Sequence, residues 1–397
     1  MQQKKAPNNK IVKLVDDLLS SSVKEGATEI YIEPKEEQSF IRAKVKGVIS
    51  MLKGKNVIER KLHHEVVSRI KTLTRTMDTE LHDLPQKGKM IVNVKNKDHY
   101  FKVITIPTLH GETVTIRNMA GWAKSVDVEK IFTGDKKLYS KVKDILNKKE
   151  GMVLITGMPG SAKTNISWSV LNEVSGLETK VFSIEDPTEI MLQSVDQIQV
   201  NKKSGMDFKK AVDSVINSDY DVMYVSDIDD SELAKTLMQE SMGGRMVISQ
   251  LMVPDAVEGL FCFSDMGIRE YITGNAVRMV INSVLEKYLC PHCKQKAKYS
   301  QAELKKIGLK ESEIKSGKFF KPKGCSKCEN TGYKGRMVIL EVLEINNSVK
   351  KAFIGGASHK EVTAVAKKEG ALHTRKESAL RLLKEGLIDL ETAKKYI

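Results

Sequence analysis

The stretch VLITGMPGSAKTNISW, residues 153–168, limits what this chain can fold into more than any other segment. An apolar run leads into a Gly-rich turn, and Lys163 and Thr164 then open a segment that reads as a helix. A strand, a turn and a helix N-terminus in this order aim several backbone N–H groups and a positive dipole at one point. A chance Gly-Pro turn is the alternative, but it does not require this order. We therefore predict an ATP-binding loop formed by Gly157, Met158, Pro159, Gly160, Ser161, Ala162, Lys163 and Thr164.

Each residue type in this loop has a physical reason to be there. The Lys163 ammonium is expected to reach the β- and γ-phosphates, and the Thr164 hydroxyl is expected on Mg²⁺. Ala162, however, occupies the position of the second glycine in the pattern G-x-x-x-x-G-K-[ST]. Alanine costs little there if its dihedrals are helical, but about 1–2 kcal/mol if φ is positive. We expect Mg²⁺ and ATP to bind, more weakly than with glycine.

Two acidic residues are expected near the same loop. VFSIEDPTE ends an apolar run at Glu185, and VMYVSDIDD ends another at Asp227. In doubly wound sheets the carboxyl ends of the strands meet at the ligand. A carboxylate there holds the Mg²⁺ shell or activates the attacking water. Surface acids at strand ends are the alternative for each.

The pattern of apolar residues predicts an α/β chain with two domains. In residues 1–122, some segments have apolar residues at helical spacing and others alternate as strands do. IVKLVDDLLSSSVKEG is predicted to be a helix, and FIRAKVKGVISML is predicted to form strands, broken at Lys46-Gly47. This mixture favours a small α+β domain. Short apolar runs then recur between helices and predict a parallel sheet covered by helices. We expect a linker at 123–139 and a P-loop domain at 140–397, with a zinc subdomain at 286–335 and a helical C-terminal region at 345–397.

Four of the five cysteines form two C-x-x-C pairs, in CPHCK and GCSKC. Two such pairs fit a tetrahedral structural Zn²⁺ site, here formed by Cys290, Cys293, Cys325 and Cys328. The segment between the pairs is longer than in a usual zinc ribbon. A small helical insertion is therefore expected between them. The alternative is a remnant that no longer binds metal.

The net charge of +14 favours a negatively charged partner. Nucleic acid, anionic lipid and an acidic protein surface are the three candidates. The lysines are scattered and no aromatic-interleaved basic patch accompanies them, so we expect no nucleic-acid partner. No apolar run approaches the roughly 18–20 residues that a membrane span needs. We expect a cytoplasmic protein.

Several landmarks then occur in one order: GATEIYIEP, DLPQKGK, TIPTLHGETVTIR, GMVLITGMPGSAKT, FSIEDPTEIMLQSVDQIQVN, YDVMYVSDIDD, CPHC and GCSKCENTGYKGR. In this the chain resembles the secretion ATPases of type II secretion and type IV pilus assembly. The resemblance implies a ring hexamer with a sensor-like small domain and a RecA-type ATPase domain. It also implies a place on the cytoplasmic side of the inner membrane, where the ring drives a pilus or secretion machine through a platform protein.

The resemblance also assigns roles to particular residues. Residues 157–164 match the family's Walker A loop, and Glu185 falls on its water-activating acid. Asp227 falls on the Walker B glutamate, and Arg117 on an arginine directed at a neighbouring subunit's phosphates. The four cysteines match the zinc knuckle of the pilus-assembly and type II branch.

Other positions depart from the family pattern. Asp229 replaces the arginine of the Walker B segment, Met252 stands at the histidine of the histidine box, and Arg245 replaces an earlier histidine. In DLPQKGK, residues 83–89, Asp83 and Lys89 replace two arginines of the family pattern, and Lys87 replaces its aspartate. An arginine that stabilises phosphoryl transfer is worth about 10³–10⁵ in rate. We expect an ATP-binding secretion ATPase relative with slow hydrolysis; the alternative is a non-hydrolysing structural or regulatory subunit in a ring with an intact paralogue.

Overall fold

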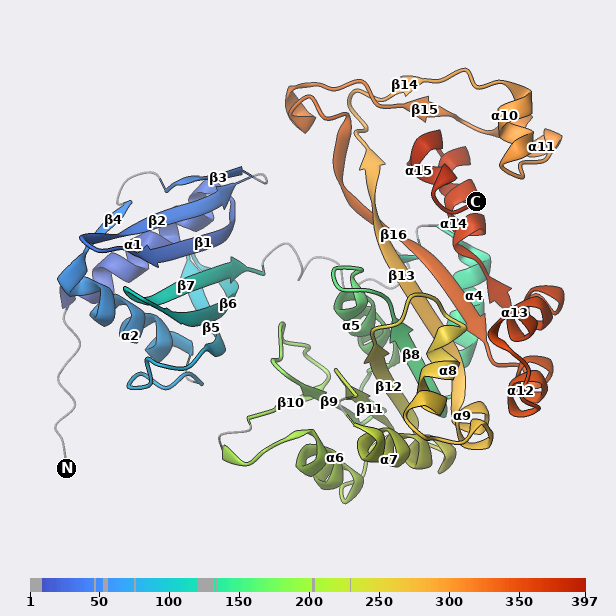
Figure 1. Cartoon of the computed structure of the whole chain (residues 1–397), viewed down its shortest axis with the longest axis horizontal. Coiled ribbons are helices and arrows are strands. Elements are labelled where there is room, and N and C mark those ends of the chain that lie inside the picture. The colour runs from blue at the N-terminus through green and yellow to red at the C-terminus, as the bar shows by residue number, and fades with distance from the viewer. Residues whose placement is uncertain are drawn as a thin grey trace. The chain divides into compact units, whose positions relative to one another are not determined.

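The computed structural model in Figure 1 describes residues 9–45, 48–52, 56–74, 76–119, 131–132, 134–201, 204–228 and 230–397. The chain divides into two compact units, residues 1–125 with 187–191 and residues 126–186 with 192–397. We call them the N-terminal unit and the C-terminal unit. The predicted break at Lys46-Gly47 lies outside the described residues, as does much of the predicted linker at 123–139, although α4 (Lys136–Leu146) begins inside that range.

The N-terminal unit packs two helices against an antiparallel sheet. The first helix, α1 (Asn9–Glu25), buries its apolar residues at helical spacing, and Gly26 follows it with φ +71°. Among the described residues the strand order is β3-β2-β1-β7-β6-β5, with β4 also paired to β2. The remaining elements are β1 (Ala27–Pro34), β2 (Gln38–Val45), β3 (Val48–Met51), β4 (Val57–Glu59), the 3₁₀ turn η1 (Arg60–Leu62), α2 (His63–Thr74), β5 (Gln86–Val94), β6 (Lys97–Thr108) and β7 (Gly111–Asn118).

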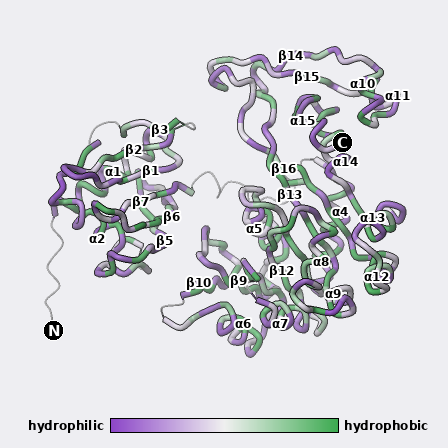
Figure 2. The backbone as a smooth tube through the Cα atoms, in the orientation of Figure 1, coloured by the Kyte–Doolittle hydropathy of each residue, from purple (hydrophilic) through white to green (hydrophobic). Residues whose placement is uncertain are grey.

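The C-terminal unit is built on a mixed sheet in the order β10-β9-β11-β12-β8-β13-β16-β17. Its first six strands run parallel and are β10 (Asp196–Gln199), β9 (Val181–Glu185), β11 (Val222–Val225), β12 (Met246–Leu251), β8 (Gly151–Thr156) and β13 (Val277–Leu289). Every residue of β8, β11 and β12 is buried, as both faces of a helix-covered parallel sheet require. Figure 2 shows this region as largely hydrophobic. The predicted α/β class is confirmed.

Helices cover this sheet and pack on it through buried apolar faces. They are α5 (Lys163–Val174), α6 (Phe208–Ile216), α7 (Ser231–Met242), α8 (Glu258–Asp265), α9 (Glu270–Ala276), α12 (Asn347–Ile354) and α13 (His359–Lys368). Within the described ranges, no helix combines the length and the apolar character needed to cross a membrane.

The strand β13 pairs with β16 (Tyr333–Glu344) antiparallel, and the two extend beyond the parallel strands as a long arm in Figure 1. Between them lies the insertion that the spacing of the cysteines predicted, with β14 (Gln295–Lys296), α10 (Gln301–Lys306), α11 (Glu311–Ser316), β15 (Phe320–Lys321) and the 3₁₀ turn η3 (Ser326–Cys328). Apolar residues of α10 pack against α14 (Arg375–Lys384) and α15 (Leu390–Lys394).

The C-terminal region is helical but contains two features that the apolar periodicity did not reveal. The short strand β17 (Leu372–His373) pairs with β16 at the edge of the sheet. The last helical stretch is divided into α14 and α15, and Gly386 between them takes φ +66°. A Cβ on Gly386 would lie 2.3 Å from the Phe320 ring, so only glycine fits there.

A buried ion pair holds α2 to β7 in the N-terminal unit. Lys71 is completely buried, and its Nζ donates to Glu112 Oε2 at 2.8 Å and to the Leu81 carbonyl at 2.5 Å. Burial acts to raise the pKa of Glu112, but the hydrogen bonds from Lys71 and His82 outweigh it and lower the pKa below its usual value. The carboxylate therefore contributes stability above that usual value, and the contribution is lost as the pH falls through the lowered pKa.

We expect Lys71→Met to destabilise the N-terminal unit by about 3–5 kcal/mol, because a buried carboxylate loses its charged partner. The measurement is amide hydrogen exchange in β6 and β7, which should accelerate strongly. Lys61→Met is the matched control, since Lys61 pairs with Glu59 at 2.8 Å on the surface and its side chain is 78% exposed. Equal exchange in the two variants would contradict a structural role for the buried pair.

Candidate nucleotide site and cysteine cluster

The predicted phosphate loop follows β8, and its last two residues, Lys163 and Thr164, are the first two of α5, in strand–turn–helix order. Gly157 and Gly160 have φ +144° and +80°, which side chains resist. At Gly157 space is also lacking, since a Cβ would lie 2.4 Å from Ser161 Oγ and 2.6 Å from the Ser283 carbonyl oxygen. The two glycines therefore set a turn that other residues would distort.

Ala162 adopts the costly one of its two expected conformations. Its φ of +74° and ψ of +23° lie in the left-handed region, directly before α5. An L-residue with a Cβ costs about 1–2 kcal/mol there. The Ala162 carbonyl still accepts the first helical hydrogen bond, from Ile166 at 3.1 Å, so the helix begins normally. The loop keeps its shape with the alanine under backbone strain.

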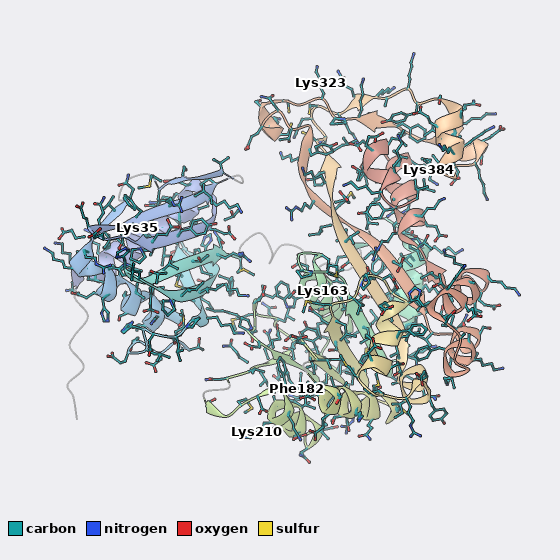
Figure 3. All side chains as sticks on the ribbon, in the orientation of Figure 1. Lys35, Lys163, Phe182, Lys210, Lys323 and Lys384 are labelled. Atoms are coloured by element: carbon teal, nitrogen blue, oxygen red, sulfur yellow. The ribbon has the colours of Figure 1, made fainter. Side chains whose placement is uncertain are left out.

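Lys163 is held over the loop by the loop's own carbonyl groups. Its Nζ donates to Gly157 O at 2.6 Å and to Met158 O at 3.3 Å. Figure 3 labels this side chain at the start of α5. Burial lowers the pKa of Lys163, and the negative charge of Asp227 opposes that shift. A cation here, beside the N-terminus of a helix, suits a phosphate group.

Glu185 is the last residue of β9 and is only 1% exposed, so it is not a surface acid. Its Oε1 accepts hydrogen bonds from Ser183 Oγ at 2.7 Å and Gln197 Nε2 at 2.9 Å. Both donors flank it on β9 and the neighbouring β10. The carboxylate is thus buried and held by side chains of the sheet itself.

Asp227 lies two residues after β11 and is exposed. The sheet order brings the ends of β9, β11, β12 and β8 to one edge, so Glu185, Asp227 and the phosphate loop share that edge. Met252 lies at the same edge of the sheet, directly after β12, and is 64% exposed. Asp229 lies outside the described residues. Thr164, in the first turn of α5, is the hydroxyl that would join Mg²⁺ in this arrangement, and the charge of Asp227 acts on the pKa of Lys163.

Arg245 and Arg117, two residues with roles or replacements expected from the sequence, are not part of this group. Arg245 precedes the first residue of β12, at the opposite end of the strand from the loop edge, and packs 4.3 Å over the Tyr220 ring. Arg117 belongs to the N-terminal unit, on β7, where it forms a 2.8 Å ion pair with Glu29. The structure therefore groups the phosphate loop, Glu185 and Asp227 within one unit, while Arg117 is engaged in the other.

Three residues that support the loop were missed by the motif analysis. Asn282 Nδ2 donates to Thr156 Oγ1 at 2.9 Å, and the neighbouring Ser283 Oγ donates to the Ser161 carbonyl at 3.0 Å. Arg375, the first residue of α14, donates to Asn282 Oδ1 at 2.5 Å. A signal for the first two exists in the sequence, because Asn-Ser separates the apolar residues MVI and VL within β13. Nothing local marks Arg375.

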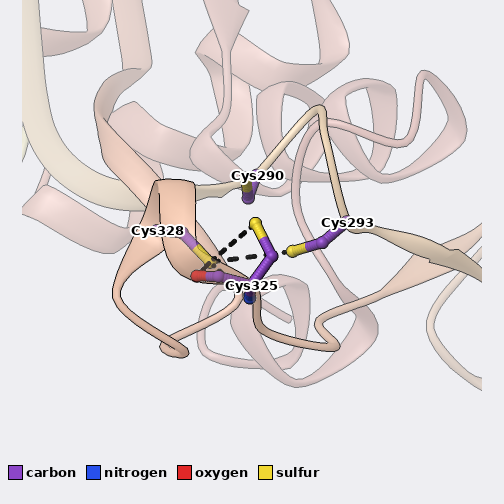
Figure 4. Close-up of side chains that lie close together, drawn as sticks. All are labelled: Cys290, Cys293, Cys325 and Cys328. Carbon is purple, nitrogen blue, oxygen red and sulfur yellow. Dashed lines mark hydrogen bonds between the residues drawn. The ribbon is translucent and has the colours of Figure 1, made fainter.

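The four cysteines come together at the end of the arm, as Figure 4 shows. Their sulfur atoms all lie within 4.8 Å of one another, and Sγ of Cys328 is 3.7 Å from Sγ of both Cys293 and Cys325. Four thiolates about 2.3 Å from a tetrahedral Zn²⁺ stand about 3.8 Å apart, so the donor set fits this ion. Backbone N–H groups of Cys325 and Gly332 point at Cys328 Sγ, at 3.2 and 3.3 Å, and favour its thiolate.

We expect Ala162→Gly to stabilise the C-terminal unit by about 1 kcal/mol, because glycine adopts the same φ without strain. The measurement is urea unfolding followed by the fluorescence of the buried Trp168. Ala364→Gly, at an exposed position within α13, is the control with the opposite sign and should lose about 1 kcal/mol. A destabilised Ala162→Gly variant would contradict the left-handed assignment.

We expect one Zn²⁺ per chain, measured by elemental analysis of the purified protein. Cys325→Ser should abolish it and accelerate hydrogen exchange over residues 290–332, because one ligand is lost from a closed four-ligand site. Cys262→Ser is the control: Cys262 lies half-buried on α8, and burial raises the pKa of its thiol to about 12. Retention of zinc by Cys325→Ser would show that these thiolates are not the ligands.

Comparison with known proteins shows which family has this sequence and fold. Residues 4–395 match the family described as Type II/IV secretion system protein. The chain is 30% identical over 384 residues to the type IV pilus assembly ATPase PilB of Pseudomonas aeruginosa, covering 96% of this chain and 66% of that protein. It is 30% identical to the type II secretion system protein E of Klebsiella pneumoniae, covering 89% of this chain and 69% of that protein.

The chain spans only part of its curated relatives. It is 28% identical to PilB of Thermus thermophilus over 96% of its own length, but this is 42% of the relative. Among solved structures, the pilus retraction motor PilT with bound ADP has a TM-score of 0.71 at 16% identity, with 96% of each chain covered. The ATPase DotB of Legionella pneumophila has a TM-score of 0.64 at 14% identity, covering 100% of this chain and 96% of that one. These structures share the fold, and the match over almost the whole sequence shows that the chain belongs to the Type II/IV secretion system protein family.

Proposed function

We propose that this chain binds Mg²⁺ and ATP at its phosphate loop and acts as a slow ATPase of a type IV pilus or type II secretion machine. The observation that carries the proposal is Lys163, whose ammonium is held by the carbonyl groups of Gly157 and Met158 at the N-terminus of α5. An incoming phosphate offers this cation a charged acceptor in place of two neutral ones, which adds charge–charge attraction to the hydrogen bond.

Slow turnover is inferred from the groups around the phosphate site. Glu185 is only 1% exposed and is held by Ser183 and Gln197, so bringing it to a water molecule needs a rearrangement. The exposed Met252 offers no polar group at the position where the family has a histidine. ATP binding depends mainly on Lys163 and backbone amides, whereas rate depends on groups that act in the transition state. Binding is therefore expected to persist where hydrolysis is weak.

The setting of this activity is part of the same proposal. We place the chain in a ring, as a hexamer of itself or mixed with a paralogue, on the cytoplasmic side of the inner membrane against a platform protein. Arg117 would then act on a neighbouring subunit's phosphates and would have to leave Glu29 to do so. Family membership and the names of the relatives support this setting. The second candidate, a non-hydrolysing subunit, is favoured by the engaged state of Glu185.

Two measurements on the purified chain test the proposal. Calorimetry with Mg²⁺ and ATP should register binding in the wild type and in Glu185→Gln, and a strong loss in Lys163→Ala. Steady-state phosphate release should exceed that of Lys163→Ala and fall by about 10²–10⁴-fold in Glu185→Gln, the usual contribution of a general base. Binding without release above the Lys163→Ala rate would favour the non-hydrolysing subunit, and absence of binding would overturn both.

A further inference from the structure

Two histidines meet at the surface of the N-terminal unit, apart from any residue used above for nucleotide binding. His64 lies in the first turn of α2, and His82 lies in the segment between α2 and β5. Their Nε2 atoms are 2.8 Å apart, and their ring centroids are separated by 4.3 Å with planes tilted by 53°. His64 is exposed and the His82 side chain is 31% exposed, so an ion from solvent can reach both.

The second nitrogen of His82 is fixed by the buried ion pair. Its Nδ1 lies 2.7 Å from Glu112 Oε2, the same oxygen that accepts from Lys71 Nζ at 2.8 Å. A carboxylate oxygen only accepts hydrogen bonds, so the proton of a neutral His82 sits on Nδ1. The Nε2 of His82 therefore presents its lone pair to His64. The glutamate that positions this ring is itself 5% exposed and held by a completely buried lysine.

Two imidazole nitrogens this close need either a shared proton or a shared cation between them. A carboxylate on the far nitrogen of a ligating histidine is the usual second shell of a metal-bound imidazole, because it fixes the ring and raises its basicity. Two nitrogens about 2.0–2.1 Å from one metal ion stand about 3.0–3.4 Å apart. The separation here differs by a few tenths of an ångström, which the exposed His64 ring can supply by rotation.

We propose that His64 and His82 form a two-histidine site for a divalent first-row transition metal ion, with Glu112 and Lys71 as its supporting shell. Imidazole suits Zn²⁺, Ni²⁺ and Cu²⁺. Within the described residues the cysteine cluster is the grouping that offers three or more such ligands together, so water completes the coordination at the histidine pair. Its affinity is accordingly much lower than that of four thiolates. Metal binding ties the start of α2 to the segment that leads into β5.

The test is a calorimetric titration of the untagged, zinc-loaded full chain with Ni²⁺. One Ni²⁺ per chain should bind, and both His64→Gln and His82→Gln should weaken it at least tenfold. His110→Gln, in the turn between β6 and β7, is the matched control and should bind as the wild type does. Absence of thiolate-to-nickel absorption excludes the cysteines as the ligands.

Hydrogen exchange gives a second readout that does not depend on heats. Ni²⁺ should slow exchange over residues 76–85 in the wild type and in His110→Gln, and leave it unchanged in the two site variants. The proposal is overturned if the wild type binds no Ni²⁺, if all variants bind it equally, or if binding leaves exchange in this segment unaffected.

Discussion

The phosphate loop depends on β13, the strand beside the one that feeds it. Asn282 holds Thr156 at the end of β8, and Ser283 holds the Ser161 carbonyl inside the loop. The Ser283 carbonyl also occupies the space that a Cβ at Gly157 would need. These contacts fix both ends of a turn whose backbone includes three residues with positive φ. The strained Ala162 conformation persists because its surroundings determine it, as is general for strained residues at functional sites.

This arrangement separates the groups that hold a phosphate from those that would speed its transfer. The backbone of the loop and Lys163 belong to one rigid strand–turn–helix element. Glu185 belongs to β9, three strands along the sheet from β8, where Ser183 and Gln197 hold it. A change at Glu185 or at its two donors therefore leaves the phosphate loop and Lys163 in place. Under the proposed function, the altered Walker B segment would therefore lower turnover while the nucleotide is still bound.

The sequence predicted those parts of the fold that short-range patterns determine. The apolar runs predicted the parallel strands because strands buried on both faces need apolar residues throughout, and the cysteine spacing predicted a helical insertion because the linking segment is too long for a simple ribbon. The sequence did not decide between helical dihedrals and a positive φ for Ala162, since neighbouring residues do not set φ at a turn. Arg375, Asn282 and the His64–His82 pair were missed because each acquires its meaning from a partner distant in sequence.

The same strand, β13, connects the phosphate loop to the cysteine cluster. Ser283 lies at its centre, opposite Leu340 of β16, whereas Cys290 directly follows its last residue. The subdomain beyond the arm has a small apolar core that it shares with α14 and α15. A four-thiolate metal site would therefore contribute most to stability there. Pairs such as Ile281 with Val342 keep the central register through backbone hydrogen bonds and burial. A metal ion bound at the far end would therefore order the tip of the arm, while the part of β13 that braces the loop is held by the core of the sheet.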